Sequence, residues 1–328
     1  MNDHFKDKNN DKNKDKDKDK DKGKGKSILS GLETAGYRAA FLPYAYTERI
    51  AKIYDALFEN SENTQFIQGA VDRFHEHNYH HKPDLPFEPL SYLVAAFPSD
   101  PAQVILHTEK GRQAVPIPPT YLDYIEERRR LVDIIKSCAD DCQTVYTEGI
   151  SHKLLAVCSG LGRFGRNNIC YIDGLGSYFD LHAFYTNIPY EGEFYPPAFL
   201  DECETCGLCE KNCPTGAIGR HPVIDAARCL TMLNESGDPM PDWLPQNVHH
   251  TLIGCLRCQE ACPRNTALPP KTMHTLELDA GETQALISAD TGSLPPELSQ
   301  KLHAFGMHDY FVSVIGRNAK LALHDHAT

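Results

Sequence analysis

The sequence predicts an α/β (α+β) protein in which a mixed domain is followed by a small cysteine-rich domain. Helical and strand-like patterns alternate before residue 196, whereas eight of the 12 cysteines lie between Cys203 and Cys262. The first 26 residues are mostly alternating lysine and aspartate. We therefore expect four segments: a disordered tail at 1–26, an α/β domain at 27–195, a cysteine-rich domain at 196–270, and a linker with C-terminal helices at 271–328.

The individual elements follow from residue spacing and from the residues that begin or end them. Ile50, Ile53 and Leu57 recur at helical spacing after Thr47, which can cap a helix, and prolines precede the helix that begins near Tyr121. Short β-branched and aromatic runs between turn residues predict strands. In chain order we expect a helix at 27–35, a strand at 37–42, helices at 47–58 and about 64–77, strands at 91–97 and 103–108, helices at 121–138 and 151–158, strands at 169–172 and 177–187, and helices near 296–305 and 309–323.

The net charge of −12 is unevenly divided along the chain. Ten lysines against seven aspartates give residues 1–26 a local charge of +3, which leaves −15 for residues 27–328. The tail has almost no apolar residues to bury, so we expect it not to fold. The acidic body does not favour broad nucleic-acid binding, which needs Lys and Arg to neutralise phosphates. Without an apolar run of eighteen residues or an N-terminal signal segment, we expect a cytoplasmic protein and no membrane partner.

Two cysteine runs predict the chemistry. The first run, Cys203–Cys213, has the spacing C-x2-C-x2-C-x3-C and is followed by Pro214, which is typical of [4Fe–4S] clusters in bacterial ferredoxins. The second run, Cys255–Cys262, has the same ending, but Leu252 stands where its first ligand would be. Two clusters need eight thiolates and the runs supply seven. We therefore expect Cys229, which lies between the runs, to be the eighth ligand.

The ferredoxin pattern also predicts which cysteines share a cluster, because the fourth cysteine of a run ligates the other cluster. One expected set is Cys203, Cys206, Cys209 and Cys262, and the other is Cys213, Cys229, Cys255 and Cys258. A zinc site is the main alternative, since C-x2-C pairs are also zinc spacing, but zinc would leave the last cysteines of each run without a role. A disulfide framework is typical of short secreted domains.

The remaining four cysteines, Cys138, Cys142, Cys158 and Cys170, are predicted to be structural, because free cysteine is commonly a small buried hydrophobe.

A glycine-rich loop precedes the strand expected at 169–172. Gly160, Gly162 and Gly165 match G-x-G-x-x-G, but the dinucleotide-binding fingerprint needs a strand before the loop and a helix after it. Here the helix comes first. We expect instead a loop whose bare backbone lets a flat or bulky ligand approach closely.

Several motifs occur together in a recognisable order. They are Gly160-Leu-Gly162-x-x-Gly165-Arg166-Asn167, Gly176-Ser177-Tyr178-Phe179, the first cysteine run, Arg228-Cys229-Leu230 and Gly254-Cys255-x-x-Cys258-Gln-x-x-Cys262-Pro263. Over about residues 146–266 the chain resembles the epoxyqueuosine reductases, cobalamin-dependent iron–sulfur enzymes related to the reductive dehalogenases. The likeness is most specific in the cysteine-rich half, and the chain reads as a paralogue.

The resemblance implies a nitroreductase-like domain that holds cobalamin, followed by a bacterial-ferredoxin-like double [4Fe–4S] domain. Where the family has a proton-donating aspartate, this chain has Tyr146, and Glu148 is a nearby alternative. By position, the residues near the corrin would be Gly162, Gly165, Asn167, Ser177 and Tyr178. Asp180 and His182 also begin a D-x-H pattern known from other cobalamin proteins, but Tyr185 replaces its glycine, so we expect both residues in the core.

The resemblance further implies an oxidoreductase. Electrons from a low-potential donor, such as a flavodoxin or ferredoxin, would pass through two [4Fe–4S] clusters to a cobalamin for reductive chemistry on an unidentified substrate. A tRNA substrate is not favoured by the net charge. The alternative is a ferredoxin-like electron-transfer or redox-sensing protein without substrate chemistry of its own. A corrin-sized pocket facing the cysteine-rich domain would distinguish the two.

Overall fold

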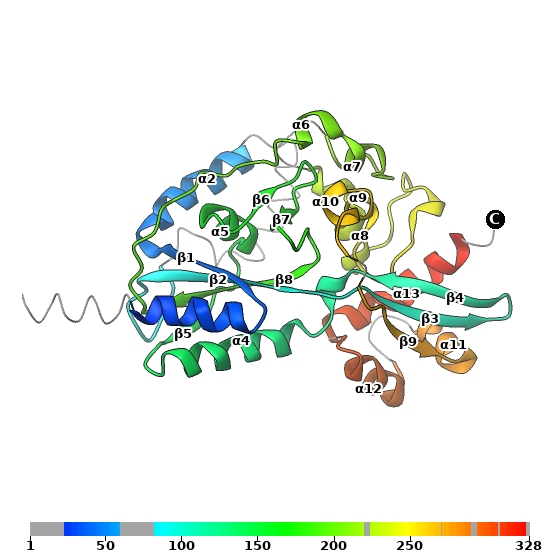
Figure 1. Ribbon diagram of the computed structural model, residues 1–328. Helices are drawn as coiled ribbons and strands as arrows, with labels where there is room; N and C mark the ends of the chain where they lie inside the picture. The colour runs from blue at the N-terminus through cyan, green and yellow to red at the C-terminus, as the bar shows by residue number, and fades with distance from the viewer. Residues whose placement is uncertain are drawn as a thin grey trace, which may run out of the picture.

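The structure is a computed structural model that describes residues 23–59, 82–219, 224–269, 271–289, 294–307 and 309–325 (Figure 1). The helix expected at about 64–77 and most of the lysine–aspartate tail lie outside these residues. Residues 23–34 are helical, so the first helix begins before residue 27, inside the segment expected to be disordered. Burial explains this start, because Ile28 and Leu32 are fully buried in the core and Lys24 forms an ion pair with Asp141 at 2.5 Å.

The larger sheet is antiparallel, with strand order β1-β2-β8-β5. Its strands are β1 (Arg38–Pro43), β2 (Ser91–Pro98), β8 (Phe179–Thr186) and β5 (Thr144–Tyr146). The two central strands are buried along almost their whole length, because successive side chains point to opposite faces and both faces are covered. Register places Tyr146 opposite Phe184, which makes β5 a short edge strand beside β8.

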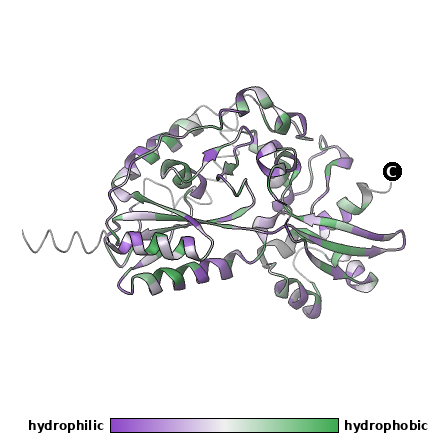
Figure 2. Cartoon of the chain, in the orientation of Figure 1, coloured by the Kyte–Doolittle hydropathy of each residue, from purple (hydrophilic) through white to green (hydrophobic). Residues whose placement is uncertain are grey.

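Helices cover both faces of this sheet (Figure 1). They are α2 (Thr47–Glu59), α4 (Tyr124–Cys138) and α5 (His152–Cys158), with the short helices η1 (Tyr44–Tyr46) and η3 (Pro119–Tyr121) beside them. Residues 23–34 and α4 pack on the face that carries Leu93 and Phe184, while α2 and α5 pack on the face that carries Val94 and Ala183. Helix α4 carries both apolar and polar residues, because one face packs on the core and the other meets solvent (Figure 2).

A second, three-stranded sheet has the order β4-β3-β9 and extends away from the first (Figure 1). Its elements and the helices packed on it are β3 (Ala102–Thr108), β4 (Gly111–Ile117), β9 (His274–Leu278), α11 (Ala280–Ser288), α12 (Pro296–Ala304) and α13 (Asp309–Asp325). β9 lies parallel to β3 and so ties the C-terminal region to a hairpin from the first half of the chain. The expectation of a polar linker from residue 271 is therefore wrong. The strand His274–Leu278 contributes Leu276 and Leu278 to a core that it shares with β3 and β4.

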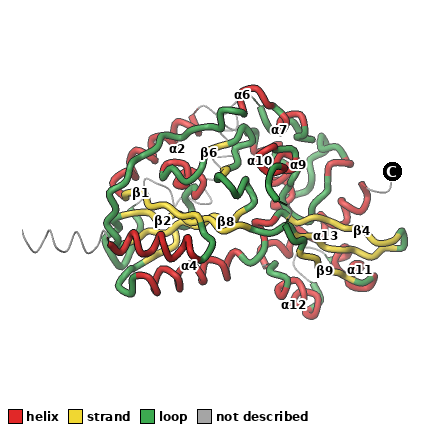
Figure 3. Tube along the Cα trace, viewed as in Figure 1, coloured by secondary structure: helices red, strands yellow, loops and turns green. Residues whose placement is uncertain are grey.

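Short helices and loops make up the cysteine-rich domain, with no strand among the described residues between β8 and β9 (Figure 3). They are α6 (Cys203–Cys206), α7 (Leu208–Lys211), η4 (Ala226–Arg228), α8 (Leu230–Glu235), η5 (Gln246–Val248), α9 (Arg257–Glu260) and α10 (Pro263–Thr266). The glycine loop forms a small hairpin, β6 (Arg163–Phe164) and β7 (Cys170–Tyr171), between the two domains. The helix α5 precedes this loop, as predicted, so the loop lacks the strand that a dinucleotide fingerprint needs before it.

None of the helices in the described part of the chain combines the length and the apolar character needed to cross a bilayer.

Candidate redox site

The first cysteine group is brought together around a small cavity. Its four members all line this space, together with Gly165 and Arg166. The turn between α6 and α7 is made by Gly207 at φ +63°, a left-handed conformation that glycine adopts without strain. Cys203 lies near Cys262, and Cys209 lies near both. The members are Cys203, Cys206, Cys209 and Cys262.

The second group is drawn from three separate segments of chain. Cys229 lies next to Cys213, and Cys255 interacts with both. Cys258 in turn interacts with Cys255 and Cys229. The division of the eight cysteines into two ligand sets stays a prediction, although the structure brings the members of each set near one another. Leu252 is fully buried in the core of the second sheet, and its carbonyl accepts a hydrogen bond from Nδ2 of Asn318 at 2.9 Å.

The thiol chemistry suits [4Fe–4S] clusters. Four sulfur donors meet in each group, and a cubane cluster takes four thiolates. No set of three or more His, Cys, Asp or Glu residues in the described ranges converges closely enough for a single metal ion, and a cubane needs its ligands further apart than one ion does. Burial raises the pKa of the Cys255 thiol to about 12 and also raises that of Cys258, so both are protonated before a metal centre binds.

The glycine hairpin holds the cysteine groups in place. Arg166 donates from Nη2 to the carbonyl of Cys203 at 2.6 Å, and its Nη1 donates to Glu210 at 2.9 Å. A Cβ atom on Gly165 would lie 2.6 Å from the Tyr171 ring, so only glycine allows this close packing. Of the residues expected near a corrin, Gly165 and Asn167 thus lie at the first cysteine group.

The other residues expected near a corrin lie close by. Gly162 packs against Cys170, since a Cβ there would be 2.7 Å from the Cys170 sulfur. Tyr178 lies near Asn265 and near Cys258 and Cys262, one cysteine of each group. Ser177 joins the two domains, because its backbone N–H donates to Asn265 at 2.8 Å and its hydroxyl donates to Gln259 at 2.9 Å.

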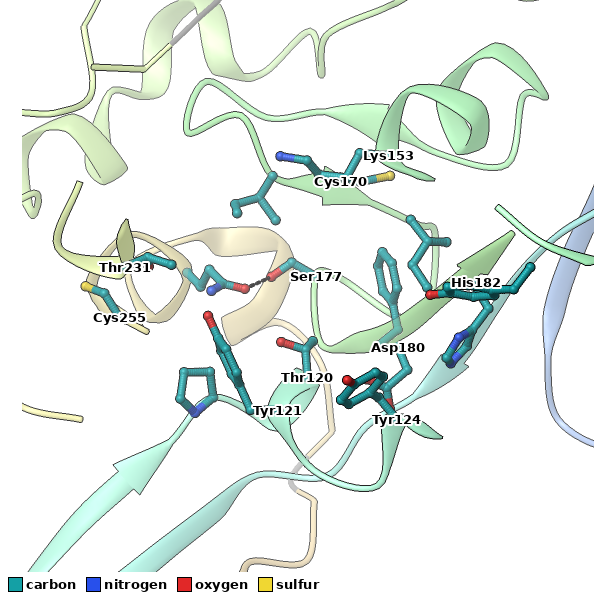
Figure 4. Close-up of a pocket in the computed structure, with 16 residues that line it drawn as sticks. Thr120, Tyr121, Tyr124, Lys153, Cys170, Ser177, Asp180, His182, Thr231 and Cys255 are labelled. Atoms are coloured by element: carbon teal, nitrogen blue, oxygen red, sulfur yellow. Dashed lines mark hydrogen bonds between the residues drawn. The ribbon is translucent and has the colours of Figure 1, made fainter. Parts of the chain in front are cut away.

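A larger cavity lies between the sheet and the cysteine-rich domain. It measures about 320 Å³, or about 930 Å³ when space open to solvent is included. Its walls come from η3, α4, β5, α5, β7, β8, α8 and α9 and the loops between them. Figure 4 shows Cys255 and Thr231 on one side of the cavity and Asp180 and His182 on the other. A cysteine of the second group and the polar residues of β8 therefore face the same space.

Tyr146 lines this cavity, whereas Glu148, two residues further on, does not. The guanidinium of Arg128 lies 4.6 Å from the centre of the Tyr146 ring, and the His152 ring meets it edge-on at 5.2 Å. Burial raises the pKa of the Tyr146 phenol to about 12, although the Arg128 charge opposes this shift. Tyr146 is thus protonated near neutral pH and lies in the cavity wall.

Two further polar side chains on β8, Asp180 and His182, are buried as expected, and they also line the cavity. Burial raises the pKa of Asp180 to about 7, although a hydrogen bond from Ser99 at 3.0 Å opposes the rise. Burial lowers the pKa of His182 to about 3, and neither of its ring nitrogens has a hydrogen-bond partner. Both are nearly buried, at 8% and 2% exposure. Their i, i+2 spacing in a strand was the signal that they share a face.

Comparisons with known proteins support this site. Residues 202–265 match the model of a 4Fe-4S double cluster binding domain. The chain is 32% identical over 149 residues to epoxyqueuosine reductase of Bacillus subtilis, which covers 44% of this chain and 38% of the relative. The chain is 31% identical over 134 residues to the enzyme of Staphylococcus aureus, a match that covers 41% of this chain and 33% of that relative. These sequence matches thus span less than two-fifths of the relatives' length.

Solved structures extend the likeness in fold. A structure of the Bacillus subtilis epoxyqueuosine reductase superimposes with a TM-score of 0.61 at 21% identity and covers 92% of this chain and 81% of that one. The enzyme of Streptococcus thermophilus gives a TM-score of 0.61 at 18% identity, with 92% and 81% covered. The predicted fold class and the resemblance are confirmed. This chain carries a double [4Fe–4S] cluster-binding domain on the fold of epoxyqueuosine reductase, and its homologues include enzymes of that name.

Proposed function

We propose that this chain is an iron–sulfur oxidoreductase that combines two [4Fe–4S] clusters with a cobalamin for reductive chemistry on a substrate yet to be identified. One observation carries the proposal. The cavity between the domains is lined by Cys255 on one side and by Tyr146 on the other. A cluster ligand and a proton donor facing one space is the arrangement that a reductive step needs.

The two cysteine groups would hold the clusters, and the cavity would hold the cobalamin. When bound, the clusters would supply one-electron carriers and the cobalamin a strongly reducing metal centre. The wall chemistry fits a corrin fringed with amides, because Ser177 and Gln259 present neutral polar groups. His182 also fits such a ligand, since its two unpartnered ring nitrogens cost free energy until something in the cavity pairs with them.

Residues of the chain itself would donate the proton to the substrate and then replace it. Tyr146 holds a proton at Oη toward the cavity, and Arg128 over its ring stabilises the phenolate left after donation. Asp180, whose pKa burial raises to about 7, can return a proton near neutral pH. Glu148 lies outside the cavity wall, so Tyr146 is the better candidate of the two.

Substrate and electron donor belong to the same proposal. One related structure is titled as epoxyqueuosine reductase with an epoxyqueuosine-modified tRNA-Tyr stem loop. The net charge of −12 does not favour such a substrate for this chain, because phosphate binding needs an excess of Lys and Arg. A low-potential flavodoxin or ferredoxin is the class of donor that suits [4Fe–4S] clusters.

A second candidate is a ferredoxin-like electron-transfer or redox-sensing protein. The placement of Gly165 and Asn167 favours it, because these residues line the first cysteine group rather than the larger cavity. In that case the chain would need clusters but no cobalamin.

Cobalt stoichiometry separates the two candidates. The chain is purified without oxygen, reconstituted with iron, sulfide and aquocobalamin, and assayed for metals and for a cob(II)alamin EPR signal. We expect about eight irons and about one cobalt per chain. Thr120→Phe, at the exposed edge of the cavity, should lower cobalt several-fold and leave iron unchanged, whereas Thr275→Phe on β9 should change neither. Eight irons without cobalt would favour the electron-transfer protein.

A further inference from the structure

Lys153 is the one cationic side chain among the described residues that line the cavity between the sheet and the cysteine-rich domain. It lies on α5, and Figure 4 shows it beside Cys170, across the space from Tyr121 and Asp180. Its Nζ donates to the backbone carbonyl of Asn168 at 2.9 Å and to Oδ1 of the same residue at 3.0 Å. Both acceptors are neutral, and no carboxylate in the described ranges forms an ion pair with this ammonium.

The titratable groups around Lys153 compensate its charge only in part. Burial raises the pKa of the Cys170 thiol to about 12 and lowers that of the His182 imidazole to about 3, so both are uncharged near neutral pH. Asp180 is the one acidic side chain among the described lining residues, and burial raises its pKa to about 7. Its carboxylate accepts a hydrogen bond from Ser99 rather than from Lys153. The cavity thus has a cationic wall in a chain whose net charge is −12.

The surroundings of Lys153 fix the position of its ammonium. Asn168 turns the β6–β7 hairpin at φ +59°, and its N–H donates to the carbonyl of Gly165 at 3.0 Å. Two of the three N–H donors of the ammonium are used by Asn168, and the third is available to a ligand. Burial lowers the pKa of Lys153, because an ammonium removed from water is costly without a nearby anion. An anionic group in the cavity offsets that cost.

We propose that Lys153 binds an anionic group, a carboxylate or a phosphate, of the molecule that occupies the cavity. The inference rests on the proposed function and adds to it the chemical class of the ligand. A lysine ammonium binds either group as a point charge with hydrogen-bond donors. Two molecules can supply the anion. One is the cobalamin, through the phosphate of its nucleotide loop, and the other is a substrate that is an organic acid or a phosphate ester.

Equilibrium dialysis of the cluster-loaded chain without oxygen tests the inference and separates these two sources. One arm compares aquocobalamin with cobinamide, which has the same corrin but lacks the nucleotide loop and its phosphate. The other arm measures the binding of labelled inorganic phosphate and labelled benzoate to the chain that carries clusters but no corrin. Both arms are run on the unaltered chain and on Lys153→Met, which keeps an unbranched side chain but has neither the charge nor the donors.

Lys153→Met should weaken binding of the anion by about tenfold or more, since hydrogen bonds to charged groups are among the stronger ones. If the anion is the phosphate of the cofactor, the loss should appear for aquocobalamin and not for cobinamide. If it belongs to a substrate, the loss should appear for labelled phosphate or benzoate, and the two corrins should bind both chains equally. Equal affinities of both chains for both corrins and both anions would overturn the inference.

Two variants serve as controls. Lys153→Arg keeps the charge and should keep most of the affinity, and Lys110→Met, at the exposed turn between β3 and β4, should change nothing. If Lys153→Met assembles fewer than about eight irons, Lys153→Gln, which keeps a donor for Asn168, takes its place.

Two other outcomes have distinct meanings. If Lys153 instead balances the charge of a cluster, its loss should lower a cluster midpoint in an EPR-monitored redox titration and leave every affinity unchanged, which would overturn the inference. Failure of the unaltered chain to bind either corrin would refute the proposed cobalamin. The labelled anions need only the cluster-loaded chain, so in that case they still decide whether Lys153 forms an anion site.

Discussion

The two cysteine groups share one ferredoxin spacing, yet the chain builds them differently. The first takes three members from the short stretch Cys203–Cys209 and lies beside Leu208, a large apolar side chain that is 38% exposed. The second is assembled from distant segments and reaches the cavity through Cys255. The first group is thus the outer one and the second the inner one. The comparison teaches that the same motif can place one cysteine group near the surface and the other against a cavity.

The largest expected effect comes from removing a ligand of the inner group. Cys229→Ala should cost about four of about eight irons and leave the outer cluster's EPR signal intact, because Cys229 belongs to the inner group alone. Iron and sulfide analysis with EPR measures this. Cys138→Ala, which lies in neither group, is the control.

A double variant sharpens this test. Adding Leu252→Cys to Cys229→Ala should not restore the lost iron, because Leu252 is fully buried in the core of the second sheet. Recovery of about eight irons would show that a cysteine at position 252 can ligate the cluster, as in the ferredoxin spacing. That result would contradict the assignment of Cys229.

The cavity beside the inner group predicts a pH dependence of stability. The folded-state pKa of Asp180 is raised to about 7 from an ordinary value of 3.8, so the folded protein binds this proton more tightly than the unfolded chain does. Its contribution is therefore most favourable below about pH 4 and is lost as pH rises to about 7, by up to roughly 4 kcal/mol. Asp180→Asn should flatten the dependence of Tm on pH between 4 and 7.

Asp133→Asn is a suitable comparison, since Asp133 is exposed on α4. Thermal unfolding without oxygen at several pH values measures both variants. An Asp180→Asn profile that matches the unaltered chain would contradict the assigned burial cost.

A smaller effect is expected from a substitution that weakens iron binding by the outer group alone. Arg166→Gln removes hydrogen bonds to the carbonyls of Cys203 and Glu204 and to the Glu210 carboxylate. Bonds to charged donors contribute about 1.5–3 kcal/mol each when buried, so the outer cluster should release iron to a chelator about tenfold faster. The inner cluster should be unaffected. Equal acceleration at both clusters would contradict the separation of the two groups.

The smallest expected effect concerns the helix that borders the cavity. The Ser151 side chain caps α5 by accepting from the N–H of Leu154 at 3.3 Å. Ser151→Ala should lower the free energy of unfolding by about 1 kcal/mol and leave iron content unchanged. Denaturant titration measures the loss. Ser137→Ala, on the exposed part of α4, should cost less.

Much of the site could be predicted from local spacing. Cysteines at steps of three followed by proline wrap a cluster over a few residues, so the motif carries its own geometry and needs little from the rest of the fold. The long helices and central strands could also be predicted from the sequence. Each of these elements buries one face or both, and the spacing of its apolar residues shows this burial, as in Thr47–Glu59, Tyr124–Cys138 and Ser91–Pro98. The ligand sets themselves stay a prediction, although the structure brings their members together.

Other features depend on partners distant in the sequence. β9 reads as a polar linker and becomes a strand only because β3, about 170 residues earlier, offers it a parallel edge. Asp180 and His182 are buried on β8, as expected, but they line a cavity whose walls also include Thr231 of α8 and Gln259 of α9, which are distant in the sequence. Asn167 and Tyr171 join the first cysteine group around its small cavity only after the hairpin folds against that group. Local patterns thus predict which residues can bind a cluster, while packing between distant segments decides what those clusters face.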